Sequence, residues 1–112
     1  MKFEGIYTPV ITPYREDFSI DYERLAQVVD FLIKAGVHGI ISAGTTGEYY
    51  AQSMQERVEL MKFIKQQIKG RTSYIVGTGA IRTEDSIEYA KAAVEVGADA
   101  LLVATPPYAL PT

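Results

Sequence analysis

The chain has 112 residues, of which 47% are hydrophobic and 22% charged, a composition typical of a folded globular domain. Its net charge is −3, and Lys and Arg are mixed with Asp and Glu along the predicted helices, so the sequence lacks the basic stripe that nucleic acid requires. It has no cysteine, which excludes disulfides and thiolate chemistry, and its apolar runs are far below the roughly 20 residues of a membrane-spanning helix.

The first half of the chain predicts a strand, a helix and a second strand. Gly5–Thr12 is rich in β-branched residues, although Pro9 makes the strand short or irregular. Asp21–Ala35 carries apolar residues at helical spacing and runs into Gly36, which indicates an amphipathic helix. Val37–Ala43 is a nearly continuous apolar run, the pattern of a strand that is covered on both faces.

A second helix is predicted between two glycine-rich segments. Ser53 and Glu56 form a capping-box signature before a new series of apolar residues at helical spacing, and Gly70 ends the series. Lysines late in this helix suit the helix dipole. Ser73–Val76 then predicts a third strand.

The last third of the chain repeats the same order. Thr83 is the predicted N-cap of a third helix, Gly97 closes that helix, and Ala98–Ala104 is the predicted fourth strand. Strands that alternate with helices indicate an α/β fold with a parallel sheet.

Two parallel α/β folds begin in this way, the doubly wound sheet and the (β/α)8 barrel, and periodicity does not separate them. A barrel has about 250 residues, so the 112 residues would supply the N-terminal portion of one, with about four strands and three helices. As part of a barrel, residues 1–112 form one domain whose C-terminal half is missing. Such a piece leaves two sheet edges and half of a core exposed.

Ligands of parallel α/β proteins bind at the carboxyl ends of the strands, where this sequence carries GTTGE, GTGA and TPPY. In Gly44–Glu48, Gly44 and Gly47 allow close approach of the backbone, while Thr45 and Thr46 offer hydroxyls and N–H groups. That set suits a small carboxylate. The local pattern is equally compatible with a tight strand-to-helix turn that binds nothing.

Three motifs in order carry a resemblance that covers essentially the whole chain. They are Gly44–Glu48, Gly77–Ala80 and Thr105–Tyr108, preceded by Thr-Pro pairs at Thr8 and Thr12. Together they resemble the dihydrodipicolinate synthase / N-acetylneuraminate lyase family. The resemblance implies a TIM (β/α)8 barrel and a lyase that joins or cleaves pyruvate and an aldehyde through a lysine Schiff base, with no cofactor and no metal.

The resemblance also implies roles for individual residues. Thr46 matches the threonine that binds the pyruvate carboxylate, within the loop that Gly44 and Gly47 shape. Thr45 matches a threonine of a proton relay, and Tyr108 matches the relay tyrosine that reaches a neighbouring subunit's site. A phenol near pKa 10 transfers protons only when its neighbours hold it in position. The partners implied are pyruvate, an aldehyde and further copies of the chain in a dimer of dimers.

The sequence departs from the family pattern in three respects. The Schiff-base lysine and a second relay tyrosine lie beyond Thr112, so this chain alone should not catalyse. Pro107 replaces an aromatic residue usual at the dimer interface. The positions that bind inhibitory lysine in regulated members are bulky and apolar, which makes lysine inhibition doubtful; they are Tyr49, Tyr50, Met54 and Ile81.

Other hypotheses remain open. Other members of the family cleave 2-keto-3-deoxy sugar acids or N-acetylneuraminate, and the chain could also be a non-catalytic fragment or a binding protein. A nucleotide-binding domain built on Gly77–Gly79 is disfavoured because Arg82 occupies the place of the third glycine. His38, at a helix-to-strand junction, is interpreted as structural, and Glu48 as a cap of the following turn. The start of the chain shows no secretion signal, so we expect a cytoplasmic protein.

Overall fold

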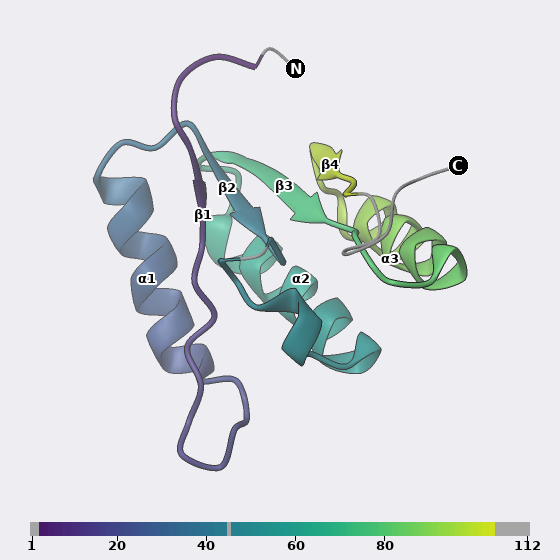
Figure 1. The fold of residues 1–112 in the computed structure, drawn as a ribbon. Coiled ribbons are helices and arrows are strands. Elements are labelled where there is room, and N and C mark those ends of the chain that lie inside the picture. Colours follow the sequence, from purple (N-terminus) through teal and green to yellow (C-terminus); the bar gives the residue numbers. More distant parts are fainter. Residues whose placement is uncertain (1–2, 45, 105–112) are drawn as a thin grey trace.

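The computed structural model describes residues 3–44 and 46–104, in which strands and helices alternate (Figure 1). The strands are β1 (Tyr7–Pro9), β2 (Gly39–Ser42), β3 (Ser73–Gly77) and β4 (Ala100–Leu102). The helices are α1 (Tyr22–Lys34), α2 (Met54–Ile68) and α3 (Thr83–Val96), and a short 3-10 helix, η1 (Tyr49–Ala51), precedes α2. The four predicted strands and three predicted helices are confirmed, whereas η1 was not predicted.

The four strands form one parallel sheet in the order β1-β2-β3-β4. Ile40 in β2 pairs with Tyr74 in β3, and Val76 in β3 pairs with Leu101 in β4. A doubly wound sheet reverses its strand order at a switch point, whereas a barrel adds strands in chain order. The described strands follow chain order throughout. Right-handed crossovers then place all three helices on one face, where α1 packs against α2 and α2 against α3.

Local signals explain where the helices begin. The Asp21 side chain accepts a hydrogen bond from a backbone N–H in the first turn of α1. At α2 the predicted capping box is present, because Ser53 and Glu56 each accept the other's backbone N–H. The predicted cap of α3 was wrong. Arg82 occupies the N-cap without a side-chain bond and Thr83 is already helical, so the acidic residues of the first turn stabilise this end through the helix dipole.

The core lies between the central strands and the helices. Nearly every residue of β2 and β3 is buried, which matches the apolar runs seen in the sequence. The side chains that fill the core are Val10, Ile20, Leu25, Val29, Ile40, Leu60, Met61, Ile64, Ile68, Tyr74, Val76, Tyr89 and Ala93. Burial of this cluster holds the three helices against the sheet and fixes the carboxyl ends of the strands relative to one another.

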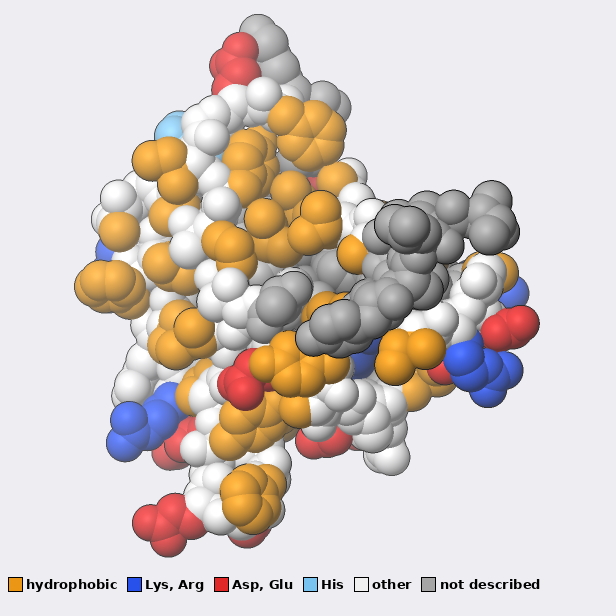
Figure 2. All heavy atoms as spheres, in the orientation of Figure 1, with side chains coloured by type: hydrophobic (Ala, Val, Ile, Leu, Met, Phe, Trp, Pro, Cys, Tyr) orange, Lys and Arg blue, Asp and Glu red, His pale blue; other side chains and the backbone are white. Residues whose placement is uncertain are grey.

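The two outer strands are much less covered. Hydrophobic side chains gather over the strands on the face toward the viewer in Figure 2. Ile6, just before β1, is 65% exposed, and Leu102 and Val103 at the end of β4 are 48% and 67% exposed. The expectation of two exposed sheet edges and an uncovered half of a core is therefore met.

Candidate active site

The Gly44–Glu48 loop starts directly after β2 with an unusual backbone conformation. Ala43 has φ 56° and Glu48 has φ 60°, so a left-handed residue stands just before the loop and another ends it. The Gly47 N–H donates to the Gly44 carbonyl oxygen at 3.0 Å, which closes a tight turn between the two glycines. Non-glycine residues in the left-handed region cost about 1 kcal/mol or more each, and such strain persists only where the surroundings hold it.

The side chains of Thr12 and Gln52 hold this loop through its Gly47 carbonyl oxygen. The Thr12 hydroxyl donates to the Gly47 carbonyl oxygen at 2.7 Å, and Gln52 Nε2 donates to the same oxygen at 3.0 Å. Gln52 Nε2 also contacts Tyr14 Oη at 3.0 Å and Thr12 Oγ1 at 3.3 Å. Burial raises the pKa of the Tyr14 phenol, and the hydrogen bond from Gln52 acts in the opposite direction. The loop is thus fixed to the segment after β1 by buried hydrogen bonds.

Gly47 is a glycine because the chain passes close to other backbone here. A Cβ at this position would lie 3.0 Å from the Val10 carbonyl oxygen. A Cβ at Gly44, by contrast, would meet no atom within 4 Å. Of the two loop glycines, only Gly47 therefore stands where a side chain would crowd its neighbours.

The second loop, Gly77–Ala80, is held by a buried arginine of α2. Arg57 is 2% exposed and donates from Nη2 to the Gly77 carbonyl and from Nη1 to the Gly79 carbonyl, both at 2.8 Å. Its guanidinium lies 3.6 Å from the ring centre of Tyr89 and 5.0 Å from that of Tyr49. Burial lowers the pKa of Arg57, and the two tyrosines act against that shift. Stacking on both rings offsets part of the cost of burying the cation.

The two loops also touch each other. A Cβ on Gly77 would lie 2.2 Å from the Ala43 carbonyl oxygen, so only glycine permits the approach. In the buried interior of the sheet, the Ser42 hydroxyl at the end of β2 and the Tyr74 phenol of β3 are hydrogen-bonded at 2.7 Å. Burial raises the pKa of Tyr74 above its ordinary value. The strands β2 and β3 therefore deliver the two loops to one place at the carboxyl edge of the sheet.

The predicted site residues divide into two groups. The structure brings Gly44, Thr46 and Gly47 together in one turn, with Gly47 buried and Thr46 exposed at the surface. Thr45 and Tyr108, the predicted relay residues, lie outside the described residues, as does Pro107. Glu48 stands at the N-cap of η1 but makes no side-chain cap bond, so its interpretation as a capping side chain was wrong.

His38 has a structural contact at the opposite end of the strands, as predicted. Its Nδ1 accepts the Ile6 N–H at 2.9 Å, just before β1. The ring also fills the space beside Gly5, where a Cβ would lie 2.2 Å from the imidazole. His38 thus joins the amino end of β1 to that of β2 and stands away from the loops that carry the motifs.

Three residues of the site were not predicted from the sequence, namely Gln52, Arg57 and Tyr14. Signals for two of them exist in the sequence. Arg57 continues the apolar stripe of α2 back by one turn from Met61, so its position on the buried face was visible. Gln52 directly precedes the N-cap Ser53, where an apolar residue is usual, and a polar residue there needs a partner. No local pattern pointed to Tyr14.

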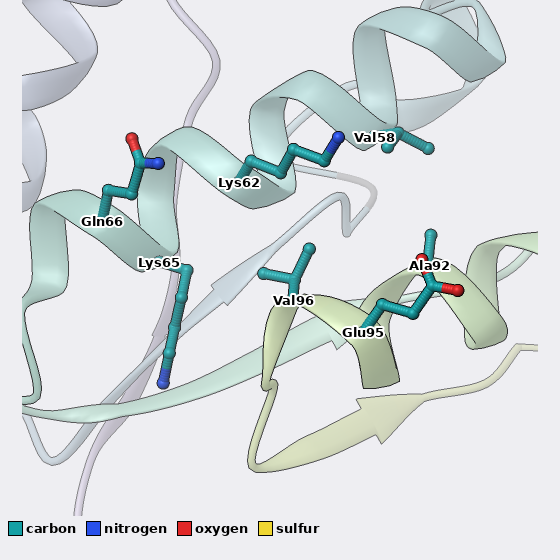
Figure 3. A pocket seen from close by; sticks show the side chains of 7 residues that line it. All are labelled: Val58, Lys62, Lys65, Gln66, Ala92, Glu95 and Val96. Atoms are coloured by element: carbon teal, nitrogen blue, oxygen red, sulfur yellow. The ribbon is translucent and has the colours of Figure 1, made fainter.

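The lysines of the described residues lie away from the carboxyl ends of the strands. Figure 3 shows Lys62 and Lys65 on α2, lining a groove between α2 and α3. Lys34 and Lys91 belong to α1 and α3, and Lys69 directly follows α2. Within residues 3–44 and 46–104, therefore, no lysine stands where a Schiff base could form beside the loops.

The described residues contain neither a metal-site cluster nor a membrane-spanning helix. No three histidine, cysteine, aspartate or glutamate side chains in that part of the chain gather as a metal site would require. No helix in the same residues has the length and apolar character needed to cross a membrane.

Comparison with known proteins places these features in a family. The sequence profile of the Dihydrodipicolinate synthetase family matches residues 2–112. The 4-hydroxy-tetrahydrodipicolinate synthase of Bacillus subtilis is 37% identical over 112 residues, which are all of this chain and 39% of the relative.

Solved structures give the same result. Dihydrodipicolinate synthase from Aquifex aeolicus superposes with a TM-score of 0.93 at 35% identity, over 98% of this chain and 37% of that one. YagE of E. coli K12, a prophage protein of the dihydrodipicolinic acid synthase family solved in complex with pyruvate, superposes with a TM-score of 0.94 at 33% identity, over 98% and 37%. The chain spans well under half the length of these relatives and has the α/β fold of the N-terminal portion of their TIM barrel. It belongs to the dihydrodipicolinate synthetase family.

Proposed function

We propose that this chain is the N-terminal part of a single (β/α)8-barrel lyase that forms or cleaves a C–C bond between pyruvate and an aldehyde through a lysine Schiff base. Its activity is most similar to that of dihydrodipicolinate synthase. The supporting observation is the motif Gly44–Glu48 after the carboxyl end of β2, in which Thr12 and Gln52 hold the Gly47 carbonyl oxygen, in a chain of this family. The pyruvate complex of a relative that is 33% identical agrees with the substrate class.

In this proposal the loop binds the carboxylate of pyruvate. Thr46 donates its hydroxyl and backbone N–H, and the glycines Gly44 and Gly47 let the backbone come close to the ligand. Thr45 and Tyr108 pass a proton between the substrate and solvent. Anchored N–H groups and hydroxyls suit an anion because they need no reorganisation when the charge arrives.

The Schiff-base lysine comes from the part of the barrel outside this chain, since no lysine in the described residues lies beside the loops. Its amine attacks the keto carbon of pyruvate and water leaves, which gives a protonated imine. The imine withdraws electrons from the adjacent carbon, so a base removes a proton there and the enamine attacks the aldehyde. These steps use side chains alone, without metal or cofactor.

Location and assembly are part of the same proposal. The protein acts in the cytoplasm as a homo-oligomer, a dimer of dimers. Tyr108 reaches the site of a neighbouring copy in that arrangement, so assembly would complete the proton relay.

Borohydride trapping tests this function directly. The natural protein that carries this segment is incubated with pyruvate and sodium borohydride, and the adduct is located by mass spectrometry after digestion. We expect a reduced pyruvate adduct on one lysine outside residues 1–112, which disappears when pyruvate is left out. No adduct on folded protein would contradict the lyase and leave a binding protein.

A second function, cleavage of 2-keto-3-deoxy sugar acids or N-acetylneuraminate, is favoured by the surface next to the site. Tyr50 and Ile81 are 67% and 78% exposed there, and they replace the small polar groups that bind lysine in regulated synthases. Release of pyruvate from a 2-keto-3-deoxy sugar acid or from N-acetylneuraminate would support this alternative. Positive trapping without release from either compound would favour the synthase.

A further inference from the structure

Gln52 lies between η1 and α2, yet its side chain turns back toward the end of β1. The residue is only 9% exposed, and Nε2 is within 3.0 Å of both the Gly47 carbonyl oxygen and the Tyr14 hydroxyl. In the described residues Oε1 is buried and has no hydrogen-bond partner. A buried amide that leaves its acceptor unpaired carries a desolvation cost, which the hydrogen bonds of its donor must offset.

Both donors of this cluster converge on a single carbonyl. Gly47 O receives the Thr12 hydroxyl at 2.7 Å and the Gln52 amide at 3.0 Å. A carbonyl oxygen has two lone pairs, so the two donors satisfy it fully. The peptide that joins Gly47 to Glu48 is therefore held from two directions.

The orientation of this peptide determines how the loop presents its other groups. The peptide is planar and trans, so its N–H points away from the carbonyl that Thr12 and Gln52 hold. On the preceding side, the Gly47 N–H is bound to Gly44 O at 3.0 Å. Thr46 is thus followed by a residue that is held by a turn through its N–H and by two side chains through its carbonyl oxygen.

We propose that Gln52 is a positioning residue for the carboxylate-binding loop: with Thr12 it locks the Gly47 carbonyl, so that the loop is preorganised for the carboxylate of a 2-oxo acid. This inference rests on the proposed function, because the ligand is the one proposed there. A glycine-rich loop without such anchors would be ordered only by the ligand, at a cost in affinity. Gln52 touches the loop and not the ligand, so its replacement affects binding and leaves the chemistry nearly unchanged.

The test measures the pyruvate concentration that gives half-maximal borohydride trapping in the natural protein. In Gln52→Leu we expect this concentration to rise about tenfold, the effect of one lost hydrogen bond, while the trapping rate at saturation changes less than threefold. Gln55→Leu is the matched control, because Gln55 lies three residues further on, is exposed in the first turn of α2 and bonds only Glu59 in the described residues. An unchanged half-maximal concentration in Gln52→Leu would overturn the inference.

A second variant gives a readout that a purely structural role would not move. Gln52→Glu has nearly the same shape, but its ionised carboxylate cannot donate to Gly47 O and repels that oxygen. As the pH falls and the new carboxyl group is protonated, the donor returns and the half-maximal pyruvate concentration should approach the value for the wild type. A pH profile parallel to that of the wild type would contradict the positioning role, and this comparison also decides the question if Gln52→Leu fails to fold.

The Thr12→Val and Gln52→Leu double variant sharpens the assignment. Loss of both donors leaves Gly47 O buried without a partner. The half-maximal pyruvate concentration should therefore rise by more than the product of the increases that the two single variants cause. Independent effects would contradict a shared target. Failure of trapping in the wild type would overturn the proposed function, whereas trapping with unaltered half-maximal concentrations in these variants would overturn only the role of Gln52.

Discussion

The two loops at the carboxyl edge are held by buried polar groups of different kinds. The Gly44–Glu48 loop is held by neutral donors, Thr12 and Gln52, which share one carbonyl. The Gly77–Ala80 loop is held by the cation of Arg57, which bonds two carbonyls and stacks on two rings. Charged donors form stronger hydrogen bonds but cost more to bury. We call Arg57 with its two carbonyls and two rings the charged cluster, and Thr12 and Gln52 with Gly47 O and Tyr14 the neutral cluster. The charged cluster should contribute more to the free energy of unfolding, while the neutral cluster adjusts the geometry of the Gly44–Glu48 loop.

The largest effect is expected when the charged cluster is removed. Arg57→Leu leaves the Gly77 and Gly79 carbonyls buried without donors, and we expect the free energy of unfolding to fall by about 3 kcal/mol. Urea denaturation of the natural protein measures the loss. Arg24→Leu is the control, since the Arg24 side chain is 75% exposed. Equal losses in both variants would show that the buried cluster is not the main support of its loop.

The contact between the two loops is tested by Gly77→Ala. The added methyl group meets the Ala43 carbonyl at 2.2 Å, and backbone on both sides must shift, so we expect a loss of about 2 kcal/mol. Gly44→Ala meets no atom within 4 Å and should change stability by less than about 0.5 kcal/mol. Thermal unfolding of the two variants compares them, and a harmless Gly77→Ala would mean that the loops move apart easily.

The buried hydrogen bond between Ser42 and Tyr74 predicts that the protein is less stable at alkaline pH. The pKa of Tyr74 is raised by burial, so its contribution to stability is fully present below the ordinary tyrosine pKa of about 10. At higher pH the unfolded chain loses this proton while the folded chain keeps it, and the free energy of unfolding falls.

Urea unfolding between about pH 8 and 11 should show that fall in the wild type and a smaller one in Tyr74→Phe. The pKa values of Tyr14 and Tyr22 are also raised, but both tyrosines remain in the variant, so the difference isolates Tyr74. At neutral pH the variant should lose about 1 kcal/mol through the missing bond to Ser42. Identical alkaline slopes would refute the assignment.

The smallest change in the free energy of unfolding is expected for Tyr14, which contacts only the Gln52 amide of the neutral cluster. Tyr14→Phe removes the hydroxyl that Gln52 Nε2 reaches at 3.0 Å but leaves its bond to Gly47 O, so we expect a loss of about 0.5 kcal/mol. Differential scanning calorimetry measures it, with the exposed Tyr50→Phe as control. A loss as large as that of Arg57→Leu would reverse the ranking of the two clusters.

The fold was largely predictable because its signals are local. Apolar runs marked β2 and β3, the Ser53–Glu56 box marked the start of α2, and glycines marked helix ends. The errors also have local causes. Pro9 and the lack of a second neighbour shorten β1, and Arg82 occupies the N-cap of α3 that Thr83 was expected to fill. Periodicity alone did not separate the barrel from the doubly wound sheet, because strand order is a long-range property; the family resemblance favoured the barrel, and the observed strand order agrees with it.

The candidate site was predictable only in part. Gly44, Thr46 and Gly47 stand in a short motif after a strand, so their shared turn follows from sequence. The supports of the loop are distant along the chain, as Thr12 and Gln52 show by meeting across 40 positions. Such pairs are set by the packing of β1 against β2, which no local pattern encodes.

The open edges of the sheet bear on how such a protein is made. In the proposed barrel, the second neighbour of β1 is the last strand of the chain. One edge of β1 therefore stays unpaired until the last strand has been synthesised. At ordinary translation rates that delay is on the order of 10 s. During this time the unpaired edge of β1 is open to pairing with strands of other chains.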